Sequence, residues 1–374
     1  MQKNELKTKK LILITSNIAP YRLLWCEELA KHLNVTIYYT KDKEVNYNDN
    51  FLKHKSKKCQ IIKMSTKRDD GLDPLCFDVI KIINNNKDSF IIFDGYGPKT
   101  NLLGLVYSKL IGKKTYVNID GYPTERKVNK LRDFIRGFTI KNLCDNFFCG
   151  GDNVKDYLIH YGANKDNICI HNFSSIRNKQ IIDKPLNKKE KLEIREKLKI
   201  EEKGNIVLGV GRFVELKRFE DLIEAIKKCK TKCSLYLLGG KPTSKYLELV
   251  GSSTNIKFID FVLPEDVDNY YKMANLFVLP SRTDVWGLVI NEAMSKGLPV
   301  ISSDSPVAAK NLVKGNGYIF KTYDIDELAK DIDKCLDLNN NKKMSKRSLE
   351  IVKDYTIEGM VERQLPIIKK YFKL

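Results

Sequence analysis

The sequence lacks any hydrophobic run long enough to cross a membrane. A membrane-spanning helix needs about 18 or more consecutive apolar residues, whereas the longest apolar run near the N-terminus, Leu11–Ile14, has the length of a strand. This run follows a lysine-rich start without the small-residue cleavage pattern of a secretory leader. We therefore expect the protein to stay in the cytoplasm.

Paired cysteines and metal-binding motifs are also missing. The nine cysteines are odd in number and contain no C-x-x-C pair, and the four histidines form no H-E-x-x-H motif. Scattered cysteines of this kind are typical of reduced, buried thiols in the cytosol, and a zinc site needs ligands at close, regular spacing. We expect no disulfide, no metal and no cofactor.

Three common active-site motifs do not occur. The sequence has no G-x-S-x-G elbow and no G-x-x-x-x-G-K-[ST] loop, so serine hydrolases and P-loop proteins lack support. A dinucleotide fingerprint G-x-G-x-x-G beginning at Gly209 fails, because Val214 occupies the position of its third glycine. The sequence therefore argues against an NAD-dependent enzyme.

The charge is strongly positive. The chain carries a net charge of +19, with 42% hydrophobic and 30% charged residues, which is a globular composition. Such a charge suits nucleic acid, an anionic bilayer or solvent. The segment Lys127–Lys141 also places apolar residues at helical spacing between its cations. That pattern is typical of a helix on a membrane surface, or of a core-packed helix with a basic outer face.

The pattern of apolar runs predicts two α/β domains. A chain of 374 residues is too long for one ordinary core. Short apolar runs alternate with amphipathic stretches in both halves, separated by polar, lysine-rich sequence at about His171–Gly204. We expect two Rossmann-like domains, residues 1–180 and 181–354, facing each other across a cleft. The C-terminal segment 355–374 is expected to return to the first domain.

The segment Phe277–Ser302 contains the most informative pattern. An apolar strand at Leu276–Leu279 is followed by a turn, by a helix that begins at Gly287, and by a second strand after Pro299. The first N–H groups of such a helix, at Gly287, Leu288 and Val289, have no partner within it and lie at its positive end. This turn is therefore predicted to bind a diphosphate.

Two carboxylates flank this predicted anion site. Asp284 precedes the helix, and Glu292 lies in its second turn. We expect one of them to hold hydroxyls of a sugar and the other to hold hydroxyls of a ribose. The alternative is a core helix that carries an exposed glutamate.

A second glycine turn adds cations. The predicted strand Ile206–Val210 runs into Gly211 and Arg212, and Lys217 stands just before the next helix. Arg212 can form two hydrogen bonds to phosphate oxygens, and Lys217 can act as a point charge. Together they would neutralise a departing nucleoside diphosphate without a metal. Alternatively, they are surface cations near a turn.

In these motifs the sequence resembles retaining glycosyltransferases of the GT-B fold, namely glycosyltransferase family 4. VGRFVELKRFEDLIEA resembles the VGR…K segment of that family, and DVWGLVINEAMSKGLPVI resembles its E-x7-E motif. The opening ITSNIAPYRLLWCEELA is similar to its first strand and turn, so the resemblance spans almost the whole chain. Within the family, the middle of the sequence is similar to bacterial enzymes that build surface polysaccharides, including capsules, on a lipid carrier.

The resemblance implies a role for each site residue. Arg212 and Lys217 would bind the diphosphate of a UDP-sugar or GDP-sugar and stabilise the leaving group, next to Gly211, Gly287, Leu288 and Val289. Glu292 would hold the ribose, and Asp284, which stands where the family usually has glutamate, would act at the donor sugar. Asp120 occupies a loop where family members often have a histidine, and it would orient hydroxyls or only cap a turn.

The function expected from this resemblance is hexosyl transfer with retention, from a nucleotide sugar to a lipid-linked saccharide acceptor. The enzyme would be peripheral on the inner face of the cell membrane, held by Lys127–Lys141. Two alternatives remain: a sugar-nucleotide epimerase of the same fold, and a basic nucleic-acid-binding protein. The second would leave the spacing of Asp284 and Glu292 unexplained and has no recognised binding module, so we expect no nucleic acid partner.

Overall fold

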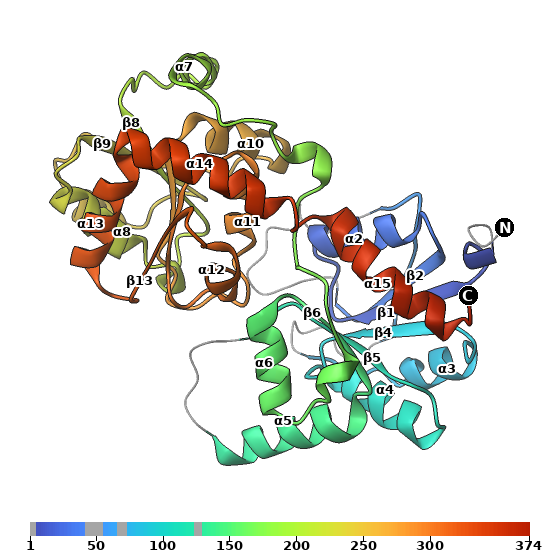
Figure 1. The fold of residues 1–374 in the computed structure, drawn as a ribbon. Coiled ribbons are helices and arrows are strands. Elements are labelled where there is room, and N and C mark those ends of the chain that lie inside the picture. Colours follow the sequence, from blue (N-terminus) through green and yellow to red (C-terminus); the bar gives the residue numbers. More distant parts are fainter. Residues whose placement is uncertain (1–4, 42–54, 66–72, 123–128) are drawn as a thin grey trace. The chain divides into compact units, whose positions relative to one another are not determined.

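The computed structural model describes residues 5–41, 55–65, 73–122 and 129–374 (Figure 1). The chain is an α/β protein with two parallel sheets, and it divides into two compact units. Unit 1 comprises the described residues of Met1–Gly121, Lys127–Ser174 and Ile357–Leu374. Unit 2 is formed mainly by Ser175–Thr356.

Unit 1 contains a seven-stranded parallel sheet in the order β3-β2-β1-β4-β5-β6-β7. Its central strands are nearly continuous apolar runs because helices cover both faces of the sheet, and Leu11–Ile14 of β1 is completely buried. The strands are β1 (Lys10–Thr15), β2 (Asn34–Tyr39), β3 (Gln60–Lys63), β4 (Phe90–Asp94), β5 (Tyr116–Ile119), β6 (Asn146–Cys149) and β7 (Ile168–Ile170).

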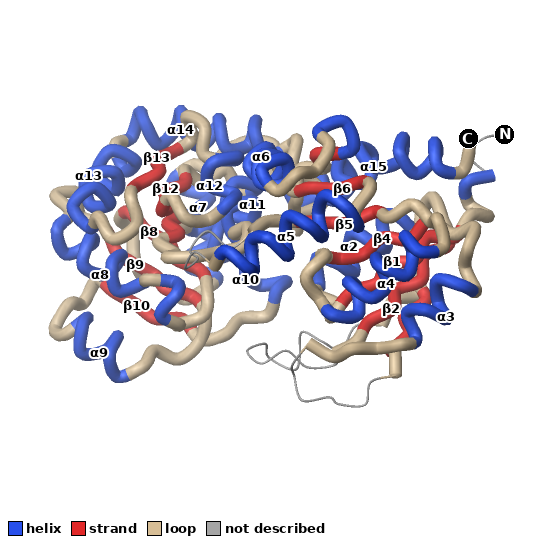
Figure 2. Tube along the Cα trace, turned by 90° about the horizontal axis from the view of Figure 1, so that it is seen from below, coloured by secondary structure: helices blue, strands red, loops and turns tan. Residues whose placement is uncertain are grey.

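Two groups of helices cover this sheet. Right-handed crossovers place α3 (Asp78–Asn84), α4 (Lys99–Leu110), α5 (Lys130–Leu143) and α6 (Asp152–His160) on one face (Figures 1 and 2). The other face carries α2 (Pro20–Leu29) and the C-terminal helix α15 (Ile357–Tyr371), which pack on each other. Trp25 of α2 donates a hydrogen bond to Gln364 of α15 (2.8 Å), and the amide of Gln364 contacts His171 (2.7 Å). The last helix therefore completes the core of unit 1.

Unit 2 contains a six-stranded parallel sheet in the order β10-β9-β8-β11-β12-β13. One face carries α8 (Phe219–Lys228), α9 (Ser244–Val250) and α13 (Ile325–Leu336). The other carries α10 (Pro264–Met273), α11 (Leu288–Ser295) and α12 (Val307–Leu312), with α7 (Lys188–Lys197) and α14 (Leu338–Val352) outside them. The strands are β8 (Asn205–Val210), β9 (Cys233–Leu238), β10 (Ile256–Ile259), β11 (Leu276–Leu279), β12 (Val300–Ser303) and β13 (Gly317–Phe320).

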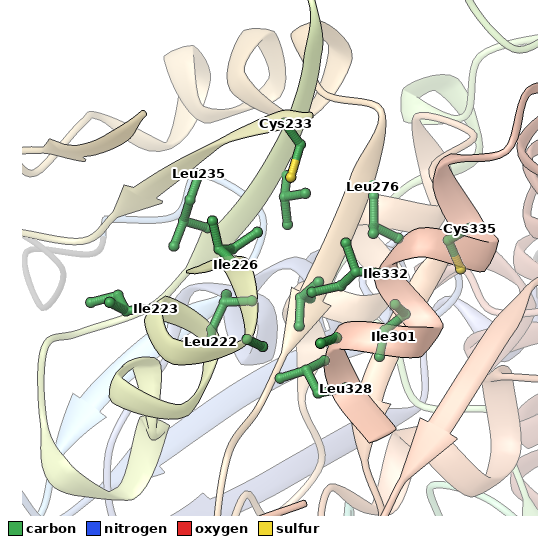
Figure 3. Packing of buried hydrophobic residues seen from close by; sticks show 14 of the residues in the cluster. Leu222, Ile223, Ile226, Cys233, Leu235, Leu276, Ile301, Leu328, Ile332 and Cys335 are labelled. Carbon is green, nitrogen blue, oxygen red and sulfur yellow. The ribbon is translucent and has the colours of Figure 1, made fainter. Parts of the chain in front are cut away.

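The core of unit 2 lies between its sheet and the helices α8 and α13. Leu222 and Ile226 of α8 and Leu328 and Ile332 of α13 point toward the strands, where they meet side chains such as Leu235 (Figure 3). All five are at most 4% exposed. This packing fixes the ends of the strands that carry the predicted site.

Each sheet has one point at which the chain order reverses. In unit 1 the connections from β1 and β4 run to opposite sides, and in unit 2 those from β8 and β11 do the same. Open α/β sheets bind their ligands at the carboxyl ends of the strands at such a switch point. A ligand site is therefore expected in the loops after β1 and β4 in unit 1 and after β8 and β11 in unit 2.

Candidate active site

The strand β8 ends in a turn that only glycine can form. Gly211 follows the strand with a φ of 154°, and Gly239, which follows β9, has a φ of 156°. A Cβ atom on Gly239 would lie 1.8 Å from the carbonyl oxygen of Gly211, closer than any side chain allows. The backbones of the two turns are therefore in direct contact after β8 and β9. Arg212 follows at once and is exposed.

The structure brings Lys217 and Asp284 together. Lys217 ends a short 3₁₀ helix, Glu215–Lys217, and its Nζ lies 2.7 Å from Oδ2 of Asp284. The two side chains are 18% and 22% exposed. The loops that hold them are also joined through the backbone, because the N–H of Arg282 donates to the carbonyl of Leu216 (2.9 Å). The loops after β8 and β11 thus form one surface at the switch point of unit 2.

The helix α11 begins at this surface. Gly287 caps it with a left-handed backbone (φ 103°, ψ 54°), and a Cβ there would crowd the side chains of Leu279 and Pro306, at 3.2 and 3.3 Å. The first N–H groups of the helix, at Leu288 and Val289, have no acceptor within it. The end of the helix therefore presents donors and partial positive charge beside Lys217 and Asp284.

Glu292 lies in the second turn of α11 and is held by two hydroxyl groups. Ser175 donates to its Oε1 (3.1 Å) and Tyr271 to its Oε2 (2.9 Å). Burial raises the pKa of Glu292, although both hydrogen bonds oppose this shift. One turn further on, the buried ammonium of Lys296 pairs with Asp268 (2.6 Å). The carboxylate of Glu292 is therefore fixed in position before any ligand arrives.

Asp120 belongs to unit 1, where it shares one buried guanidinium with a second carboxylate. Arg22 of α2 is 4% exposed, hydrogen bonds to Asp120, and lies 2.8 Å from Oδ1 of Asp94. The amide of Asn118 donates to both carboxylates, at 3.1 and 2.9 Å, and Thr15 donates to Asp94 (2.9 Å). We call these five residues the Arg22 cluster. Burial and the charge of Asp120 raise the pKa of Asp94, whereas Arg22 lowers it.

The helix α5 turns a row of apolar side chains to solvent. These side chains follow helical spacing and are 51–71% exposed: Leu131, Phe134, Ile135 and Phe138. Its opposite side, with Arg136, Thr139 and Ile140, is buried. Residues 127 and 128 of the segment Lys127–Lys141 lie outside the described residues. In the rest of the segment the apolar side chains are exposed, so this helix is not the alternative of a core-packed helix with a basic outer face.

The predicted site residues thus fall into two groups. Gly211, Arg212, Lys217, Asp284 and the start of α11 surround the switch point of unit 2, with Glu292 behind them, whereas Asp120 stands in unit 1. Sequence reasoning missed four of their hydrogen-bond partners, Ser175, Tyr271, Arg22 and Asn118, and also Asp94, which shares Arg22 with Asp120. Of these, only Asp94 carried a local signal, as the polar end of the apolar run FIIFD. Among the described residues, no three His, Cys, Asp or Glu side chains gather as metal ligands.

Two parallel, doubly wound sheets, the second with a glycine turn that opens a helix at its switch point, are the features of a GT-B fold. Solved structures of that class superpose over nearly the whole chain. A sucrose-phosphate synthase from Thermosynechococcus elongatus gives a TM-score of 0.75 at 17% identity and covers 98% of this chain and 100% of its own. Anabaena HepE in complex with UDP gives 0.73 at 16% identity, with the same coverage of both chains.

Sequence comparison relates the chain to known glycosyltransferases. Residues 190–350 match the family model "Glycosyl transferases group 1". The capsular polysaccharide biosynthesis glycosyltransferase CapM of Staphylococcus aureus is 26% identical over 82% of this chain and 81% of its own. An uncharacterized glycosyltransferase of Haemophilus influenzae is 29% identical over 48% of this chain. The match spans half of that relative and 31% of a Methanocaldococcus jannaschii relative. The chain therefore has the GT-B fold, its residues 190–350 match the glycosyl transferases group 1 family, and it is homologous to glycosyltransferases of capsule and lipopolysaccharide synthesis.

Proposed function

We propose that the protein transfers a hexosyl group, with retention of configuration, from a nucleotide sugar to a lipid-linked saccharide in bacterial surface polysaccharide synthesis. The observation that carries this proposal is the Lys217–Asp284 pair beside the N-terminus of α11 (2.7 Å). It places a cation, a carboxylate and the N–H donors of a helix end at the switch point of unit 2. A diphosphate joined to a sugar has the matching pattern of charge and hydroxyl groups.

In the proposed reaction the bond between the anomeric carbon and the phosphate oxygen breaks, and the acceptor oxygen bonds to the same face of the sugar. The proton of the acceptor hydroxyl passes to an oxygen of the departing diphosphate. Arg212, Lys217 and the start of α11 stabilise the charge that develops on this leaving group. Fixed donors of this kind need no reorganisation during the reaction, which is why they lower the barrier.

The carboxylates have separate roles in this proposal. Glu292, held by Ser175 and Tyr271, accepts hydrogen bonds from the ribose hydroxyls. Asp284 acts at the donor sugar, where positive charge develops at the anomeric carbon. Asp120, held by Arg22, orients a sugar hydroxyl from unit 1.

The relatives support a nucleotide sugar as donor and a polysaccharide pathway as the setting. HepE has been solved with UDP and with UDP-glucose. CapM carries capsule biosynthesis in its name, and a Rhizobium meliloti relative is a lipopolysaccharide core biosynthesis glycosyltransferase. These relatives support a nucleotide sugar as donor, and we propose a UDP-sugar or GDP-sugar with no nucleic acid partner.

The exposed face of α5 supports a peripheral position on the inner face of the cell membrane. No described helix has the length and hydropathy to cross a bilayer. The exposed side chains of Leu131, Phe134, Ile135 and Phe138 can enter the headgroup region, while Lys130, Arg132 and Lys141 attract anionic lipid. This arrangement would bring unit 1 to a lipid-linked acceptor.

A ligand panel tests the donor. Thermal stability of the full chain is measured with UDP, GDP, ADP and their hexose conjugates, without metal and with EDTA. A ligand at a hundred times its dissociation constant should add about 2.7 kcal/mol of stability. The donor so identified is then incubated with and without bacterial membranes. Transfer only with membranes supports the proposal, whereas conversion of the donor without any acceptor would indicate an epimerase. If none of these nucleotides binds, the proposed function is contradicted.

Vesicle sedimentation tests the membrane contact. Phe134→Ser with Phe138→Ser should abolish binding to vesicles of phosphatidylglycerol and phosphatidylcholine, and salt should weaken the binding of the wild type. Phe77→Ser is the matched control, since Phe77 is 65% exposed in the same unit but lies outside α5. Equal binding to neutral and anionic vesicles would refute the proposed contact of α5 with an anionic membrane.

A further inference from the structure

We infer that Asp94 and Asp120 form a binding site for the hydroxyl groups of an uncharged sugar on unit 1. The inference rests on the proposed function, because it assigns this site to the saccharide of the acceptor. It adds Arg22, Asp94 and Asn118 to the residues that the reaction needs.

The hydrogen bonds of the two carboxylates leave acceptor positions open. An ionised carboxylate accepts about four hydrogen bonds. Within the described part of the chain, the Oδ1 of Asp94 accepts hydrogen bonds from Arg22 and Asn118, and its Oδ2 accepts one only from Thr15. The Oδ1 of Asp120 likewise accepts hydrogen bonds from Arg22 and Asn118. Among the described residues, its Oδ2 accepts a hydrogen bond only from Arg22. Each Oδ2 therefore has one further position for a hydrogen-bond donor.

Asn118 gives an independent indication of a missing donor. Its side chain is 1% exposed and uses its amide nitrogen to bridge the two carboxylates. Its Oδ1 is buried and has no hydrogen-bond partner among residues 5–41, 55–65, 73–122 and 129–374. A buried polar atom without a partner costs about 1–3 kcal/mol, so a ligand or water that donates to it would be stabilising. The Arg22 cluster therefore has three acceptor positions that further donors can fill.

The charge of the cluster selects an uncharged ligand. One guanidinium faces two carboxylates, so the cluster carries an excess of negative charge when both are ionised. It would repel a phosphate or a carboxylate, whereas it accepts neutral hydroxyl groups. A saccharide offers several neighbouring hydroxyls that can donate to two carboxylates. The diphosphate of a lipid-linked acceptor must then bind elsewhere than at Asp94 and Asp120.

The site is rigid and stands where the topology expects a ligand. Thr15 ends β1, Asp94 ends β4, and the two strands are neighbours at the switch point of unit 1. Arg22 lies over the rings of Tyr21 (5.3 Å) and Trp25 (5.2 Å), and Trp25 is in turn bonded to α15. Because the guanidinium cannot move freely, both carboxylates keep their positions in the absence of ligand.

The experiment measures sugar binding by saturation-transfer NMR on the full chain. The probes are the methyl glycosides of glucose, galactose, mannose and N-acetylglucosamine, with glucuronate and glucose 6-phosphate as charged counterparts. Wild-type protein should bind at least one neutral glycoside at millimolar concentration and neither charged sugar. Asp94→Asn and Asp120→Asn should each weaken that binding about 10-fold or more, the effect expected for a hydrogen bond to a charged group.

Asp88→Asn is the matched control, because Asp88 is exposed just before β4, at the other end of the strand from Asp94. It should bind the glycoside as the wild type does. Thermal melting with the nucleotide that binds unit 2 reports whether each variant is folded. If nucleotide binding is kept and glycoside binding is unaffected in both Asn variants, the inference is wrong while the proposed function stands.

Two results on wild-type protein alone would also overturn the inference, whether or not the variants fold. One is binding of glucuronate or glucose 6-phosphate as tightly as the neutral glycosides. The other is the absence of binding for every neutral glycoside. Failure of every nucleotide to bind would contradict the proposed function instead.

Discussion

Replacing Asp284 by asparagine is expected to tighten the binding of a bare nucleoside diphosphate while slowing transfer. In the ligand-free structure the ammonium of Lys217 is already paired, with its Nζ 2.7 Å from Asp284. A diphosphate that binds Lys217 must compete with this carboxylate. The neutral amide of the Asp284→Asn variant would leave the ammonium available, and the substitution would remove a negative charge beside the phosphates.

The size of this effect follows from the geometry. Two unit charges about 3 Å apart attract by roughly 5 kcal/mol at an effective dielectric constant of about 20. Both side chains are partly exposed, however, at 18% and 22%. Pairs open to solvent contribute only about 1 kcal/mol after screening and desolvation. Since about 1.4 kcal/mol is a factor of ten, the dissociation constant should fall roughly 5-fold, and relief of repulsion acts in the same direction.

Calorimetry measures this change in affinity for the wild type, Asp284→Asn, Lys217→Met and the double variant, which together form a double-mutant cycle. The titrant is the nucleoside diphosphate that binds the wild type. Lys217→Met should weaken binding about 10-fold, and Asp284→Asn should then bring little gain in the Lys217→Met background, because no ammonium remains to be released. Steady-state kinetics of Asp284→Asn should show a lower kcat. Weaker binding of the diphosphate by Asp284→Asn would refute the competition between carboxylate and phosphate.

Three further predictions concern stability. Burial raises the pKa of Glu292, so the contribution of this group to stability is lost as the pH rises above the usual glutamate range. In urea denaturation, Glu292→Gln should therefore gain stability relative to the wild type as the pH rises through and above that range. Burial lowers the pKa of His171 to about 3, so the contribution of this residue to stability is present above about pH 6.5 and is lost on acidification. His171→Gln should reduce the slope of unfolding free energy against pH in this acid range by about 1.4 kcal/mol per pH unit. An unchanged slope would show that His171 is not buried as a neutral ring. Gly239→Ala should lower stability by about 3 kcal/mol or more, since its Cβ would meet Gly211; Gly97→Ala, where a Cβ meets nothing within 4 Å, should melt as the wild type does.

The sequence predicted the architecture where the signal was local. The strand at Leu276–Leu279 and the helix that follows Gly287 appear where the apolar runs and glycines indicated. The GT-B fold, with parallel sheets in both units, is confirmed. Local patterns suffice here because strands covered on both faces must be continuously apolar.

The partners within the site were not predictable in the same way. Lys217 and Asp284 were each selected from a motif, but their contact joins residues 67 positions apart. Ser175 reaches Glu292 across 117 positions, and Arg22 reaches Asp120 across 98. A single sequence contains no period or spacing that encodes such pairs. The roles assigned to these residues stay predictions until the variants are measured.

The return of α15 to unit 1 has a consequence for synthesis of the protein on the ribosome. Unit 1 begins to emerge first, but Gln364, which binds both Trp25 and His171, is made only after the whole stretch Ser175–Thr356 of unit 2. At about 5–20 residues per second this delay lasts roughly ten to forty seconds. During that time the apolar side of α2 has no covering helix, while unit 2 has its own sheet and core and can fold. The nascent chain should therefore expose a chaperone-binding surface around Trp25 until α15 is released.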